Sequence, residues 1–229
     1  MFIRWIFLSL LFFFHLYSNT GSFIKNPSQI DPSYTAQVYR SVNSCYIGQT
    51  NQIVFTWSDK SLQNPYYAIY DVKSNSLTTN PTPINGGGYN KGTYQDIFCC
   101  YNSSSNQVVF SWASAETIFN PYYAIYDVAK SSFTTNPTLI NEGLYSLGAF
   151  DVFCCYNSVS NQIVFSWADS HQIHPYYAIY DVKNGNFTTN PTPINVAVES
   201  FNVFCCYSSL FNQVVFSFGG YDKNNNGIP

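Results

Sequence analysis

The chain has 229 residues, of which 46% are hydrophobic, 19% are aromatic and only 9% are charged, with a formal net charge of −3. This composition is too apolar for a disordered chain, and the lack of a basic patch argues against nucleic acid as a partner. The length suits one domain with a sizeable core, and the many Tyr, Phe, Val and Ile residues favour strands.

The N-terminal segment reads MFIRWIFLSLLFFFHLYSNTGS. Arg4 precedes an apolar run over residues 5–14, and small and polar residues follow, which is typical of a signal peptide cleaved near residues 18–22. We therefore expect residues 1–21 to be a signal peptide and the protein to be secreted, periplasmic or at the cell surface. The run is shorter than the ~20 residues of a transmembrane helix, so no stable membrane span is expected. Alternatively, residues 13–18 form a diverged strand of the repeat that follows.

The rest of the chain, residues 22–229, repeats itself. One string recurs as NQIVFTW, NQVVFSW, NQIVFSW and NQVVFSF, and its copies end at Trp57, Trp112, Trp167 and Phe218. The strings PYYAIYD and NPTPIN, the latter with small changes, recur in step with it. Such a period indicates a solenoid or propeller, in which one unit cannot bury its apolar face alone.

Each unit contains four short runs bounded by turn residues. In the third unit these runs are FDVFCCY (150–156), NQIVFSWA (161–168), PYYAIYDV (175–182) and NFTTNPTPI (186–194). The second run alternates with a period of two residues, and no stretch shows the 3.6-residue period of a helix. Four antiparallel strands per unit predict the blade of a β-propeller.

The two ends of the chain match the two parts of one unit. Ser22–Tyr46 aligns without a gap with Ser132–Tyr156, so the chain opens with a fourth strand, and Phe201–Phe218 supplies a first and a second strand. We therefore predict an all-β fold, a four-bladed β-propeller-like ring of about 55-residue repeats closed by the N- and C-terminal strands. The missing third strand is expected from residues 13–18, if they are not cleaved, or from Tyr221 onward; failing both, the alternatives are a fragment of a larger ring or two chains that join. An incomplete ring would make self-association possible.

The repeat resembles the β-propeller repeats of secreted and cell-surface bacterial proteins, in which an aromatic-rich VFSW strand is followed by a YAIYD strand and a turn. The resemblance covers about residues 22–218. It implies a fold rather than a function, because propellers serve as lectins, hydrolases, scaffolds and inhibitors.

The repeats differ mainly in the loops at one end of the strands, where second and third strands join and where units join. Loops on a rigid scaffold commonly bind ligands. We therefore expect a non-enzymatic binding or interaction module with a protein or glycan ligand. The candidate ligand face comprises Lys60, Gln63, Glu116, Phe119, His171, His174, Tyr89 and Tyr145.

A repeat lectin is the first alternative. Tyrosine pairs follow the variable loops and could stack on sugars, although packing between blades is their more usual role. These pairs are Tyr66/Tyr67, Tyr122/Tyr123 and Tyr176/Tyr177.

A glycosidase-like enzyme is the second alternative. Asp96 and Asp151 precede the first strand of two units and could ring a central channel, and glycosidases use two carboxylates. Asn202 stands at the same place in the last unit, so we do not expect an enzyme. His171 and His174 have no third ligand at a set spacing, so no metal or cofactor is expected.

Acidic residues also recur after YAIY, where they are expected to form turn hydrogen bonds; they are Asp71, Asp127 and Asp181.

The chain has seven cysteines, six of them in three adjacent pairs at one repeat position. Adjacent side chains of a strand point to opposite faces, so one cysteine of each pair is expected to pack as a small hydrophobe. Disulfides between neighbouring units are an alternative, and vicinal bridges or metal ligation are further ones. The cysteines are Cys45, Cys99, Cys100, Cys154, Cys155, Cys205 and Cys206.

Overall fold

A computed structural model describes residues 38, 40–59, 64–84, 93, 95–115, 119–140, 148–170, 174–194, 199–221 and 227–228. The chain divides into two units, residues 1–33 and 34–229, and all described residues belong to the second unit. The described residues form strands and turns without a helix, so none of them lies in a helix that could cross a membrane. The all-β prediction is confirmed.

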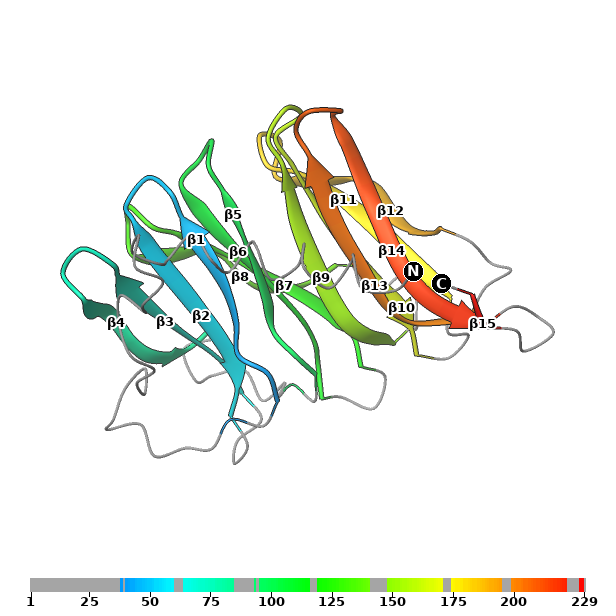
Figure 1. The fold of residues 1–229 in the computed structure, drawn as a ribbon, viewed down its shortest axis with the longest axis horizontal. Coiled ribbons are helices and arrows are strands. Elements are labelled where there is room, and N and C mark those ends of the chain that lie inside the picture. Colours follow the sequence, from blue (N-terminus) through cyan, green and yellow to red (C-terminus); the bar gives the residue numbers. More distant parts are fainter. Residues whose placement is uncertain are drawn as a thin grey trace, which may run out of the picture. The chain divides into compact units, whose positions relative to one another are not determined.

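Four antiparallel sheets follow one another along the chain (Figure 1). The first sheet contains β1 (Asn43–Ile47), β2 (Gln52–Ser58), β3 (Pro65–Asp71) and β4 (Ser76–Pro83). The second contains β5 (Phe98–Asn102), β6 (Gln107–Ala113), β7 (Pro121–Asp127) and β8 (Ser132–Leu139). The third contains β9 (Ala149–Asn157), β10 (Gln162–Asp169), β11 (Pro175–Asp181) and β12 (Asn186–Pro193). In the fourth, β13 (Glu199–Ser208) pairs with β14 (Gln213–Tyr221), and β14 pairs with β15 (Gly227–Ile228).

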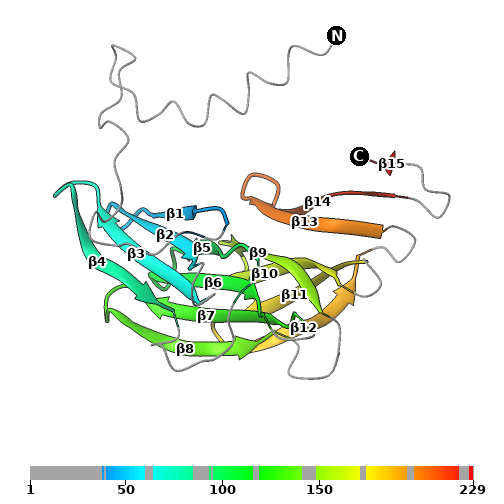
Figure 2. The ribbon, with the colours of Figure 1, turned by 90° about the horizontal axis from the view of Figure 1, so that it is seen from below.

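The strands of each complete sheet lie in sequence order, as in a propeller blade. The first strands β1, β5, β9 and β13 lie toward the inside of this arrangement, and the fourth strands β4, β8 and β12 lie on its outer side (Figure 2). The predicted propeller-like fold of about 55-residue, four-stranded repeats is therefore confirmed. For brevity the sheets are called blades below.

Apolar side chains fill the space between consecutive blades. Between the first and second blades, Val54 and Ile69 share a buried cluster with Phe110 and Trp112. Between the second and third blades, Val109 and its neighbours share an equivalent cluster with the aromatic residues of β10. Strands β6 and β10 are consequently buried on both faces, which explains their nearly continuous apolar sequences.

A hydroxyl group at the centre of the second strand in each of the first three blades donates a hydrogen bond to the next blade. Thr56 Oγ1 donates to the carbonyl of Ile97 at 2.7 Å. Ser111 Oγ donates to Val152 and Ser166 Oγ to Val203, both at 2.6 Å. These polar residues therefore tie the blades together inside an apolar interface, with each hydroxyl satisfied by a buried carbonyl.

The fourth blade is only partly built from the described residues. In β15, Ile228 pairs with Gly220 and Gly227 with Tyr221, so residues after Tyr221 occupy the place of a third strand. The predicted N-terminal fourth strand, near residues 23–30, and the alternative third strand at 13–18 lie outside the described residues. Ring closure through the N-terminus stays a prediction.

Candidate functional site

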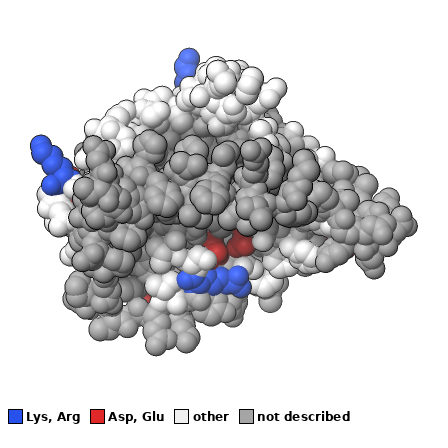
Figure 3. All heavy atoms as spheres, in the orientation of Figure 1, with Lys and Arg blue, Asp and Glu red and all other residues white. Residues whose placement is uncertain are grey.

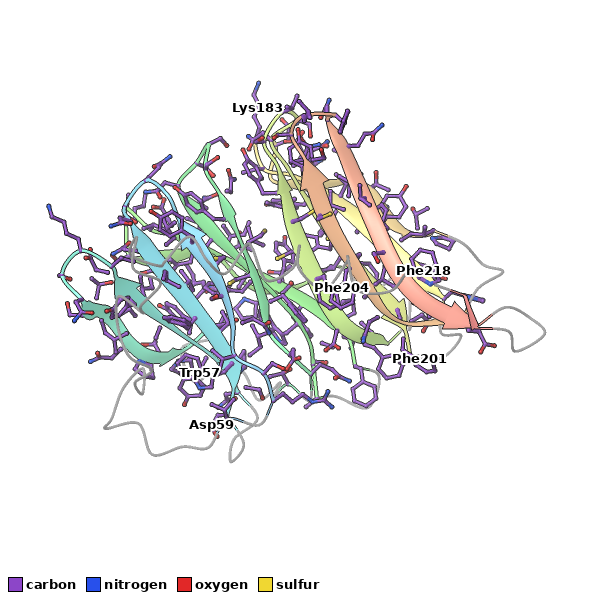
Figure 4. All side chains as sticks on the ribbon, in the orientation of Figure 1. Trp57, Asp59, Lys183, Phe201, Phe204 and Phe218 are labelled. Atoms are coloured by element: carbon purple, nitrogen blue, oxygen red, sulfur yellow. The ribbon has the colours of Figure 1, made fainter. Side chains whose placement is uncertain are left out.

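The loops that vary between repeats and the turns that do not lie at opposite ends of the strands. Trp57 and Asp59, at the end of β2, lie at one end of the blades, and Lys183, in the turn between β11 and β12, lies at the other (Figure 4). Variable loops join β2 to β3 and each fourth strand to the next blade, so they share the end that carries Asp59. We call this end the variable-loop end.

The structure describes only two residues of the predicted ligand face, Phe119 and His174. The backbone carbonyl of each accepts a hydrogen bond. The Asp169 N–H donates to the His174 carbonyl at 2.9 Å, and the Ala149 N–H donates to the Phe119 carbonyl at 2.7 Å. The second bond links the second blade to the third. Phe119 has a φ of 46°, an uncommon conformation for a residue with a side chain. The other six positions are outside the described residues: Lys60, Gln63, Glu116, His171, Tyr89 and Tyr145.

Of the tyrosine pairs after the variable loops, the pair of the second blade packs fully inside the protein, whereas Tyr66 and Tyr177 of the other two pairs are partly buried. Tyr122 stacks on Trp112 of its own blade, with ring centroids 5.9 Å apart and planes at 16°. Tyr123 instead contacts Phe165 of the next blade at 5.5 Å. Both tyrosines are buried, at 3% and 5% exposure. The packing role expected for these residues is confirmed, so the stacking surface that a lectin would need is not formed by this pair.

A row of polar groups crosses the inner strands near the variable-loop end. The Ser41 N–H donates to Asp96 Oδ1 at 3.0 Å, and the Asp96 N–H donates to Asp151 Oδ1 at 3.3 Å. With its amide oriented to satisfy both groups, Asn202 donates from Nδ2 to Asp151 Oδ2 at 3.1 Å. Each residue of the row belongs to a different blade and lies just before its inner strand or among the first four residues of that strand.

The charges of Asp96 and Arg40 both act on the carboxyl group of Asp151. Partial burial is the largest cause that raises the pKa of Asp151, and the negative charge of Asp96 raises it further. The Asp96 N–H and the positive charge of Arg40 act in the opposite direction and lower it. In the space-filling view, acidic groups meet a basic group near the middle of the face shown (Figure 3). Asp151 is thus set apart as the carboxyl group that holds a proton more readily than an exposed aspartate.

The remaining recurring aspartates have a structural role. Asp71, Asp127 and Asp181 accept hydrogen bonds from backbone N–H groups three residues later, at 2.6, 3.0 and 2.9 Å. These bonds close the turns between third and fourth strands, as expected from their positions. In the described part of the chain, no three His, Cys, Asp or Glu side chains are grouped in a way that could hold a metal ion.

Sequence reasoning found Asp96, Asp151 and Asn202 but missed Ser41 and Arg40. A signal for Ser41 existed, because it lies one repeat period before Asp96. Arg40 carried no such signal, since the charged group comes from the residue before the repeated position.

No family model and no curated protein matches the chain. Solved structures do match. A protein of unknown function from Dyadobacter fermentans matches with a TM-score of 0.58 and 12% identity over 80% of this chain and 50% of that one. A Hadza microbial sialidase matches with a TM-score of 0.57 and 10% identity, over 82% of this chain and 43% of that one. An α-L-arabinofuranosidase from Podospora anserina matches with a TM-score of 0.50 and 11% identity, over 87% of this chain and 68% of that one.

The chain spans half or less of the length of the first two proteins. At these identities the similarity establishes the fold, a propeller of the type found in glycosidases. It also corrects the prediction of a non-enzymatic module, because the structural neighbours include glycosidases and favour the glycosidase-like alternative. The sequence was misleading at Asn202, which interrupts the carboxylate pattern. Asp96 and Asp151 are 55 positions apart and meet only because their blades are adjacent.

Proposed function

We propose that this protein is a glycosidase-like enzyme that cleaves a glycosidic bond near Asp96 and Asp151. The observation that carries the proposal is the contact between these two acidic residues across neighbouring blades, at 3.3 Å from the Asp96 nitrogen to Asp151 Oδ1. Hydrolysis of a glycoside needs one carboxyl group to protonate the leaving oxygen and a second to act as base or nucleophile.

The environment suggests which group donates the proton. Burial and the charge of Asp96 raise the pKa of Asp151, so Asp151 suits the general acid. Asp96 then supplies the second carboxylate. Arg40 lies close enough to act on Asp151, and its guanidinium could orient a sugar hydroxyl or carboxylate.

The position of Asp96 and Asp151 supports a catalytic role rather than a purely structural one. Asp96 lies just before β5 and Asp151 is the third residue of β9, so both lie near the variable-loop end, where the loops that differ between repeats would contact the rest of a substrate. We further propose that the protein is exported, as its signal-like N-terminus and its bacterial-type propeller repeat suggest, which would place it where polymeric glycans occur.

The test is hydrolysis of fluorogenic aryl glycosides, including sialosides, galactosides and arabinofuranosides, by the full chain. Asp151→Asn and Asp96→Asn should each lower kcat by at least ~100-fold, the usual contribution of an acid–base group. Asn202 shows that the fold accepts an amide at this repeat position, so Asp151→Asn should remain folded.

Asp181→Asn is the matched control, because Asp181 belongs to a turn between β11 and β12 and should not affect turnover. The proposal is wrong if the folded protein cleaves none of the substrates, or if both inner variants keep full activity. Glycan binding without cleavage would instead support the lectin.

A further inference from the structure

The cysteines occupy neighbouring positions on the inner strand of every blade. β5, β9 and β13 each carry an adjacent pair, and β1 carries a single cysteine. Because successive side chains of a strand point to opposite faces, one thiol of each pair faces the preceding blade and the other faces the following blade.

Thiols from consecutive blades therefore meet. Hydrogen bonding joins the thiols of three pairs, and each pair spans two blades; the pairs are Cys45 with Cys99, Cys100 with Cys154, and Cys155 with Cys205. Packing agrees with this arrangement, because Cys45 and Cys99 lie against the core cluster between the first two blades. Cys100 and Cys154 lie against the cluster between the second and third blades.

Backbone contacts place the same thiols independently. Cys154 Sγ lies 3.8 Å from the carbonyl oxygen of Val109, and Val109 is the residue directly opposite Cys100 in the second blade. Cys205 Sγ lies 3.6 Å from the carbonyl oxygen of Val164, which is opposite Cys155 in the third blade. The same geometry thus recurs at two interfaces, with each thiol aimed at the partner position of the preceding blade.

We propose that the three thiol pairs are redox sites at which oxidation forms disulfides that link consecutive blades. Cys45–Cys99, Cys100–Cys154 and Cys155–Cys205 would join all four blades through their inner strands. Each pair offers two sulfur ligands, and the described residues provide no third ligand, so oxidation suits these sites better than metal binding.

The chemistry is thiol–disulfide exchange with a small-molecule disulfide. One protein thiolate attacks the oxidant, releases one thiol and forms a mixed disulfide, and the second protein thiol then displaces the other half. Each protein disulfide forms with the loss of two protons and two electrons from the cysteines, and the oxidant is reduced to two thiols. The protein needs no other reactant.

The Cys155–Cys205 pair should react first. Its shared hydrogen bond is the main cause that lowers the pKa of Cys205, and burial opposes this effect. The same hydrogen bond and burial raise the pKa of Cys155. The inner strand of the fourth blade is also the most exposed of the inner strands, so an oxidant reaches this pair more readily than the other two.

Cys206 is left without a partner among these pairs and is exposed. It takes the same place in the fourth blade as Cys155 in the third. The position that would face it from a following blade is occupied in the first blade by Ser44, where the other blades have cysteine. The number of cysteines is odd because the first blade has Ser44 where a partner for Cys206 would stand. Cys206 therefore provides an internal control.

The test counts free thiols. The full chain is incubated folded with oxidised glutathione, then denatured and labelled with a maleimide mass tag. The reduced protein should take up a tag on each of its seven cysteines. In the oxidised protein only Cys206 should stay outside a protein disulfide, and it should carry either one tag or one glutathione. Each disulfide formed should also lower the mass by about 2 Da, the two hydrogens lost on oxidation.

Two variants separate the proposal from other cysteine chemistry. Oxidised Cys206→Ser should take up no tag, and in oxidised Cys205→Ser both Cys155 and Cys206 should stay outside a protein disulfide, each with one tag or one glutathione. The melting temperature should rise on oxidation in wild type and Cys206→Ser alike and return on reduction. Full labelling after oxidation, mixed glutathione adducts that do not resolve on any of the six paired cysteines, or bridges within one adjacent pair would each overturn the proposal.

Discussion

At the scale of single residues, the repeated asparagine before each second strand has a conformational role. Asn51, Asn106, Asn161 and Asn212 have φ values of 56°, 53°, 54° and 50°, which is the left-handed region that few side chains tolerate. A tyrosine from the preceding strand donates its hydroxyl to each asparagine, for example Tyr101 to Asn106 Oδ1 at 3.0 Å. The invariance of asparagine in NQ[IV]VF follows from both requirements.

Replacement of Asn106 should separate these two contributions. Asn106→Ala should destabilise the protein by about 1–2 kcal/mol, because alanine strains the left-handed turn and loses the tyrosine contact. Asn106→Gly keeps the turn unstrained and should cost less. Urea unfolding measures both, and a glycine variant as unstable as the alanine variant would show that the backbone conformation is not the cause.

Asp151 should make folding less favourable as the pH rises. Its folded-state pKa is raised, so its contribution to stability is fully present below the ordinary aspartate pKa of about 3.9 and is lost as the pH rises through the folded value. Asp151→Asn should therefore gain stability relative to wild type between about pH 4 and neutrality.

Asp127 supplies a control of opposite sign. The Lys130 N–H and side chain lower the pKa of Asp127 in the folded protein. The contribution of Asp127 to stability is therefore present above the pKa of an unfolded aspartate and is lost as the pH falls through the folded value. Asp127→Asn should lose stability at neutral pH and approach wild type in acid. Urea midpoints measured across this pH range check both variants, and parallel curves for the two would contradict the assigned environments.

At the scale of strands, the sequence period identified the elements closely. The expected run 161–168 corresponds to β10 at Gln162–Asp169, and 186–194 corresponds to β12 at Asn186–Pro193. The burial of Trp112 and Trp167, each 2% exposed, was also predictable, because both end apolar strands at one repeat position. The individual partner that each interface residue contacts in the next blade was not predictable, since residues 55 positions apart carry no local signal of which neighbour they face.

The tryptophan at the end of β10 contributes through its volume. Trp167 is buried, and its Nε1–H has no hydrogen-bond partner among the residues that the structure describes, so the indole gains nothing there from its polar group. Trp167→Ala should cost ~3–5 kcal/mol through the cavity it leaves. Trp167→Phe should cost much less, because it removes an unsatisfied donor and matches Phe218 at the same position of the fourth blade. Thermal unfolding checks the pair, and equal losses would refute this account.

At the scale of the whole molecule, the same repeat position lies in two different environments. Val164 in the third blade is 2% exposed and faces the fourth blade, whereas Val215 in the fourth blade is 49% exposed. The repeat therefore predicted which residues form interfaces between blades, but it did not predict that Val215 would be exposed at the position where Val164 is buried.

These two valines test whether that face is free in solution. Val164→Ala removes two buried methyl groups and should cost about 2 kcal/mol. Val215→Ala should cost less than ~0.5 kcal/mol, as is usual for exposed positions. Both substitutions are chemically identical and lie at equivalent positions of β10 and β14, so differences in strand propensity cancel. Urea unfolding at several protein concentrations gives the two values. Equal costs would show that another surface covers Val215: at all concentrations if the ring closes within one chain, and only at high concentration if a second chain supplies the cover.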